Sequence, residues 1–127
     1  MAYEFRNHYS PEEARALLPQ VRQWLDQLSG LRSQLDNLDE ALAGMTTSGR
    51  DIGGEDVNRW VRVLADIRCI LWEFYKRDIR LKDLDRGLVD FPSLRAGKEV
   101  FLCWEKGEED IQFWHELDAG YAGRQPL

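Results

Sequence analysis

A regular helical spacing of apolar residues over positions 17–42 constrains the fold of this chain more than any other feature. Leucine or valine recurs there every three or four residues, which is the period of an α-helix and not of a strand. Ser10-Pro11-Glu12-Glu13 precedes the pattern as a capping box with proline at the first helical position. We therefore predict a long helix from about residue 10 to residue 43, with a kink or short break at Pro19.

A second helix is predicted from about Glu55 to Arg77, and the glycine-rich residues 44–54 between the helices are predicted to be a flexible linker. A phosphate-binding loop is the weaker interpretation of this linker, because no strand precedes it and no Gly-Lys-Ser/Thr sequence is present. Two helices that each carry an apolar stripe can bury it against one another. We expect an antiparallel helical hairpin over residues 10–77.

The apolar face of the second helix is wider than one neighbouring helix can cover. It comprises Val57, Trp60, Val61, Leu64, Ile67, Ile70, Leu71, Trp72, Phe74 and Tyr75. Either the C-terminal segment or another subunit must cover the remainder. We predict a homodimer whose helices meet as a bundle or coiled coil, with Trp24, Ile70 and Trp72 as interface candidates.

The period changes after Arg77, and the rest of the chain is typical of short antiparallel strands. Strands are predicted at 79–81, 88–91, 98–104 and 111–116, and Phe91-Pro92 is expected to end the second of them. The fold class is therefore α+β and mainly α: a long antiparallel hairpin with a small C-terminal antiparallel sheet. The 127 residues are expected to form one domain, with the sheet and tail over 79–127.

The register of the last two strands decides which side chains can meet. Pairing Trp104 with Ile111 makes one face almost purely apolar and places His115 on it, so this register is favoured. Cys103 and His115 then lie on opposite faces and cannot share a metal ion. A slip of one residue would bring them together.

Charge and composition restrict the partners. The net charge is −6 and no more than two basic residues are adjacent, which disfavours nucleic acid. No apolar stretch is long enough to span a membrane, and the N-terminus has no secretory h-region. Cys69 and Cys103 follow no zinc or redox spacing, and we expect free thiols in a cytoplasmic protein. No cofactor is implied and no catalytic motif is recognised.

Ionisable residues gather near the last strand and the tail. A ligand or divalent-metal site could be built there from Asp90, His115, Glu116, Asp118 and Arg124. The alternatives are structural: a hydrogen-bonded core histidine, an aspartate that caps a turn, and an arginine whose salt bridge to Asp90, Glu116 or Asp118 pins the tail.

Short motifs along nearly the whole chain resemble a prokaryotic family catalogued as domain of unknown function 2203. They are Ser10-Pro11-Glu12-Glu13-Ala14-Arg15, Leu17-Leu18-Pro19, Gly87-Leu88-Val89-Asp90-Phe91-Pro92, Leu102-Cys103-Trp104, Gly107-Glu108, Trp114-His115-Glu116, Gly120 and Ala122-Gly123-Arg124-Gln125-Pro126-Leu127. The resemblance implies a small cytoplasmic bacterial protein and points to no activity or catalytic residue.

Two functions of different classes remain open on the sequence alone. The favoured one is a protein-interaction or scaffolding module that acts as a homodimer, with an unidentified protein as a further partner, because of the wide apolar face. The alternative is a small-ligand or divalent-metal-binding protein with its site at the C-terminal hairpin and tail.

Overall fold

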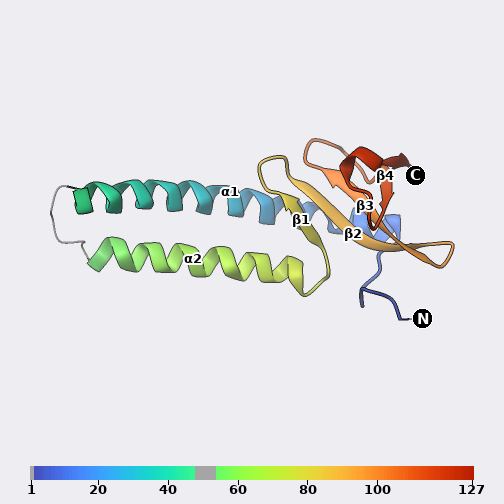
Figure 1. Ribbon diagram of the computed structural model, residues 1–127, viewed down its shortest axis with the longest axis horizontal. Helices are drawn as coiled ribbons and strands as arrows, with labels where there is room; N and C mark the ends of the chain where they lie inside the picture. The colour runs from blue at the N-terminus through green and yellow to red at the C-terminus, as the bar shows by residue number, and fades with distance from the viewer. Residues whose placement is uncertain (1, 48–53) are drawn as a thin grey trace.

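A computed structural model describes residues 2–47 and 54–127, and it confirms an α+β fold made of a helical hairpin and an antiparallel sheet. Helix α1 (Pro11–Thr47) lies antiparallel beside helix α2 (Gly54–Tyr75), and the sheet stands at one end of this hairpin (Figure 1). The strands are β1 (Arg80–Asp83), β2 (Leu88–Arg95), β3 (Lys98–Glu105), β4 (Phe113–Glu116) and β5 (Gln125–Pro126), and the 3-10 turn η1 (Tyr121–Gly123) precedes β5.

The predicted capping box opens α1. The Ser10 hydroxyl accepts the Glu13 N–H at 3.1 Å, and the Glu13 carboxylate accepts the Ser10 N–H at 3.1 Å. The helix continues through Pro19 without the predicted break, and both Pro19 and Arg15 are exposed, so the Arg15 carbonyl that loses its partner is open to water. Residues 44–47 of the predicted linker are helical, and residues 48–53 lie outside the described residues.

The core forms where the first third of α1 crosses one face of the sheet. Ala14, Leu18 and Val21 of α1 belong to one buried cluster with Val89, Phe91, Leu102 and Trp104 of the sheet. Trp104 is fully buried, and its indole N–H donates to the Glu108 carbonyl at 2.9 Å. Beyond this crossing α1 packs on α2, so the same stripe of α1 serves two neighbours in succession (Figure 1).

The five strands follow one another in chain order, β1-β2-β3-β4-β5. Strand β2 runs on through Pro92 to Arg95, so the expectation that Phe91-Pro92 ends it was wrong. Pro92 is tolerated because its missing N–H faces the side where β1 has ended, and its carbonyl accepts the Tyr9 N–H there. A two-residue turn, Ala96-Gly97, joins β2 to β3 with φ of 53° and 78°, the backbone of a type I′ hairpin.

The N-terminal segment is held against the sheet by two carboxylates. Glu99 accepts the backbone N–H groups of Glu4 (2.7 Å) and Phe5 (3.0 Å) and contacts the His8 ring at 2.8 Å. The Asp78 carboxylate accepts the backbone N–H groups of Arg6 and Asn7. Residues 4–9 therefore form a strap across the sheet.

The predicted register of the last hairpin was wrong by one residue. Cys103 pairs with Phe113 and Phe101 with His115, and β4 begins only at Phe113. Ile111 is not a strand residue, because it lies in the connecting loop and turns its side chain into the core beside α1. Counting its apolar side chain into the strand alternation caused the error.

Helix α2 packs on α1 along one side only. Val63 and Phe74 are buried, and Trp60, Ile67 and Ile70 are half-buried on that side. Trp24, expected at an interface, is instead buried against Phe74, with ring centroids 5.2 Å apart. Over the described residues, neither helix is apolar over a length sufficient to span a lipid bilayer.

The capping box predicts opposite effects for two serine substitutions in α1. Ser10→Ala removes the acceptor of the Glu13 N–H and should lower the free energy of unfolding by about 1 kcal/mol. Ser33→Ala, at an exposed mid-helix position, should leave it unchanged or raise it by about 0.5 kcal/mol. Urea unfolding followed by circular dichroism measures both, and equal effects would contradict the cap.

The Glu99 carboxylate should make the attachment of the strap sensitive to acid. Burial acts to raise the pKa of Glu99, but hydrogen bonds from His8, Glu4 and Phe5 outweigh it and hold that pKa below 4.5. A lowered carboxyl pKa stabilises the fold above the pKa of the unfolded chain, and this stability is lost as the pH falls through the folded pKa.

We therefore expect Glu99→Gln to reduce stability at pH 7 by about 1 kcal/mol, a value discounted for partial solvent screening. It should also flatten the loss of stability below pH 4.5, since the substituted side chain no longer titrates. Thermal unfolding from pH 3 to pH 7 measures this. Glu40→Gln, an exposed position on α1, is the control and should retain the wild-type pH profile.

Candidate functional site

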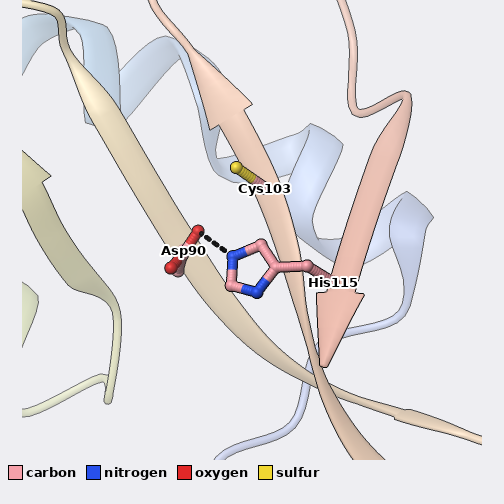
Figure 2. A group of neighbouring side chains, drawn as sticks. All are labelled: Asp90, Cys103 and His115. Carbon is pink, nitrogen blue, oxygen red and sulfur yellow. Dashed lines mark hydrogen bonds and ion pairs between the residues drawn. The ribbon is translucent and has the colours of Figure 1, made fainter. Parts of the chain in front are cut away.

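Three buried ionisable side chains meet on the face of the sheet opposite α1. Asp90 of β2 and Cys103 of β3 are direct cross-strand partners, and His115 of β4 is diagonal to Cys103. One potential ligand atom from each, a carboxylate oxygen, the thiol sulfur and an imidazole nitrogen, lies within 4.8 Å of the other two. Figure 2 shows the His115 ring directed at Asp90, with Cys103 farther along β3. We call this the Asp90–Cys103–His115 cluster.

The hydrogen bonds of His115 fix which nitrogen faces the cluster. Its Nδ1 lies 2.7 Å from the Glu116 carbonyl oxygen, and a carbonyl can only accept, so Nδ1 carries a hydrogen and donates it. Its Nε2 lies 3.1 Å from Asp90 Oδ1. Asp90 and His115 thus form a buried hydrogen-bonded pair.

Side chains from both ends of the chain cover this face. Phe5 of the strap packs on Phe101, and the Arg80 guanidinium lies over both rings. On the other side the Arg124 guanidinium lies 3.9 Å from the centre of the Phe113 ring. The three cluster residues are at most 2% exposed as a result.

The environment of Cys103 keeps its thiol protonated. Burial raises the pKa of Cys103 to about 12, with the negative charge of Asp90 and a hydrogen bond to Asp90 adding to the effect, while Arg124 acts in the opposite direction. A thiol with this pKa is a poor nucleophile in the absence of a cation. The arrangement therefore argues against thiol catalysis by the cluster as it stands.

The other predicted site residues lie elsewhere. Glu116 forms an ion pair with Lys98 at 2.8 Å, and these two residues line a shallow surface hollow together with the exposed Asp118. Arg124 binds Glu108, with Nη2 at 2.8 and 2.6 Å from its two oxygens, so the tail is pinned by a carboxylate outside the predicted set. The five residues do not converge on one pocket. Only Asp90 and His115 meet.

Cys103 is the member that sequence reasoning excluded, and the cause was the incorrect register. Its position opposite Asp90 depends on the β2–β3 pairing, which extends through the predicted strand end at Pro92. The sequence did allow the correct register as an alternative: the shift of one residue places Cys103 and His115 on one face. Nothing local to Cys103 distinguishes that register from its alternative.

The fold and cluster define a small α+β protein with a helical hairpin and a buried group of mixed nitrogen, oxygen and sulfur donors. The chain belongs to the family described as "Uncharacterized conserved protein (DUF2203)", whose model matches residues 7–127 and confirms the resemblance. No curated protein and no solved structure matches the chain.

The two cysteines predict a large contrast in thiol reactivity. Cys69 is exposed on α2, whereas Cys103 is buried and its pKa is raised to about 12. Native protein should titrate one thiol rapidly with a chromogenic disulfide reagent, and the second at least about 100-fold more slowly until denaturant is added. Cys69→Ser should abolish the fast phase alone. Two fast thiols in the native protein would contradict the buried position of Cys103.

Proposed function

We propose that this protein is a protein-interaction module that forms a homodimer through α2. The single observation that supports this most is an apolar stripe on the side of α2 that faces away from α1. The stripe consists of Val57, Val61, Leu64, Leu71, Trp72 and Tyr75, all at least 36% exposed. Exposed apolar patches of this extent on soluble proteins are typical of interaction surfaces.

The spacing of the stripe is that of a coiled-coil seam. Its residues at 57, 61, 64, 71 and 75, with Arg68 in the one polar position between them, alternate steps of four and three residues, as the inward positions of a heptad do. The opposite seam of α2 already packs on α1 within the same chain. A second helix in the free seam would complete the cover of α2 and produce a bundle of two hairpins.

A second copy of this chain fits the seam when the two α2 helices run antiparallel. A two-fold axis near Asp66 places Val57 against Tyr75 of the partner subunit, Val61 against Leu71 of the partner subunit and Leu64 against Arg68 of the partner subunit. Each layer then joins complementary heptad positions. A parallel pair would place Arg68 against its own copy and bury two like charges together.

The small side chain of Ala65 lies beside the proposed axis and allows the two backbones to approach. Trp72 stacks on Tyr75 of its own helix, with ring centroids 5.3 Å apart, and both are more than half exposed. Exposed, pre-stacked aromatic residues of this kind are the usual anchors of interfaces. A homodimer in the reducing cytoplasm would also agree with the two free thiols.

The decisive experiment is a mass measurement by light scattering after gel filtration, with two matched leucine variants. Wild type should elute at about twice the chain mass of 14.9 kDa. Leu71→Glu should give a folded monomer, because it places a carboxylate in the seam. Leu94→Glu changes a leucine of the same exposure on β2 (42% against 43%) and should remain a dimer. A monomeric wild type at micromolar concentration would overturn the proposal.

The orientation is tested by a cysteine at the proposed axis. In a Cys69→Ser background, Ala65→Cys should cross-link the dimer under mild oxidation, since only antiparallel packing brings the two copies of position 65 within disulfide reach. Arg62→Cys in the same background lies outside the seam and should not cross-link. The reverse result would contradict the antiparallel seam.

A further inference from the structure

We propose that the Asp90–Cys103–His115 cluster is a binding site for a divalent transition-metal ion, with zinc as the best match. Carboxylate oxygen, thiolate sulfur and imidazole nitrogen are the three kinds of ligand that proteins offer to zinc. They come here from three adjacent strands and from one face of the sheet. A surface acidic cluster has neither this donor mixture nor this burial.

The distances suit a tetrahedral ion after a small contraction. Ligand atoms bound to one zinc ion lie about 3.3–3.7 Å apart. The corresponding atoms of the cluster lie within 4.8 Å of one another, and His115 Nε2 is already 3.1 Å from Asp90 Oδ1. A contraction of about 1 Å at the cysteine side chain is within the range of a rotamer adjustment. Three protein ligands would leave a fourth position for water.

His115 is already oriented as a metal ligand. Metal-binding histidines donate the N–H of the non-coordinating nitrogen to a carbonyl or carboxylate, which fixes the ring and the tautomer. The Nδ1–H bond to the Glu116 carbonyl has this role and leaves Nε2 directed into the cluster (Figure 2).

The charge balance also permits the ion to be buried. The cluster would offer a divalent cation a carboxylate, a thiolate and a neutral imidazole, and the two negative charges of this set balance the charge of the ion. The nearby Arg124 adds no net charge, because it is paired with Glu108.

The edge of the sheet offers a route of entry. His115 lies on β4, which has four residues, and β4 is followed at the edge by the two exposed residues of β5. So short an edge can open locally while the rest of the sheet remains intact. The ion would then be enclosed when the edge closes.

Cobalt is the probe for the test, because a thiolate bound to Co²⁺ gives a strong near-ultraviolet absorption band. The chain carrying Cys69→Ser retains Cys103 as its sole thiol, so any thiolate band must arise from the cluster. We expect one equivalent of Co²⁺ to produce the band and one equivalent of Zn²⁺ to abolish it. Zn²⁺ alone should also raise the melting temperature of this protein.

Variants of the three ligands complete the experiment. Cys103→Ser should abolish the band and weaken Zn²⁺ binding at least about 100-fold, and Asp90→Asn and His115→Gln should each weaken it at least about 10-fold. Asp118→Asn, at an exposed position outside the cluster, should bind as wild type does.

Two outcomes would overturn the proposal. One is the absence of a stoichiometric cobalt band in the folded Cys69→Ser protein. The other is a band that persists in Cys103→Ser and disappears in Cys69→Ser. Because Cys69→Ser alters only an exposed helical position, the first measurement remains decisive even if the cluster variants do not fold. The oligomeric state plays no part in either readout.

Discussion

The contact between the first third of α1 and one face of the sheet is the interaction on which the rest of the molecule depends. Leu18 and Val21 lie against Phe91, Leu102 and Trp104 in this contact, and all are buried. It orients α1 so that its remainder leaves the sheet and needs a second partner. Helix α2 supplies that partner, but the sheet covers no more than the last turns of α2. The free seam of α2 is a consequence of this geometry.

The same contact divides the sheet into two unequal faces. The face toward α1 is apolar, whereas the other must be covered by whatever the two chain ends provide. The strap with Phe5 and the tail with Arg124 do so, using aromatic rings and guanidinium groups in place of a helix. Ionisable residues are tolerated on this second face because they satisfy one another, as Asp90 and His115 do.

Most of the architecture could be predicted from the sequence, since the helices have long periodic patterns and a complete capping box. The sheet was harder to predict because its strands are short and because two local sequence signals pointed to the wrong strand boundaries. Pro92 indicates a strand end, yet β2 continues because the edge of Pro92 that faces away from β3 borders the N-terminal segment and not β1. Ile111 indicates a strand residue, yet it is a loop residue that fills the core.

The prediction of the candidate site was wrong because Ile111 had been assigned to a strand. Because a strand alternates with period two, a shift of one residue transfers every side chain to the other face. Asp90 and His115 were singled out by residue type alone, but their meeting with Cys103 is a property of pairing between three strands. A salt bridge that pins the tail was one of the alternatives for Arg124, but its partner is Glu108 of the loop between β3 and β4 and not Asp90, Glu116 or Asp118.

The strap and the tail have a consequence for how the chain folds as it is synthesised. Glu4 is held by Glu99, 95 residues later, and the backbone N–H of Leu127 donates to the Gln112 carbonyl. The helical hairpin is complete in sequence at Tyr75, so it leaves the ribosome well before these contacts can form. The second face of the sheet cannot close until Arg124 has left the ribosome. A chain that stops before Arg124 therefore leaves the Phe113 ring uncovered and lacks one of the side chains that close the face around Asp90, Cys103 and His115.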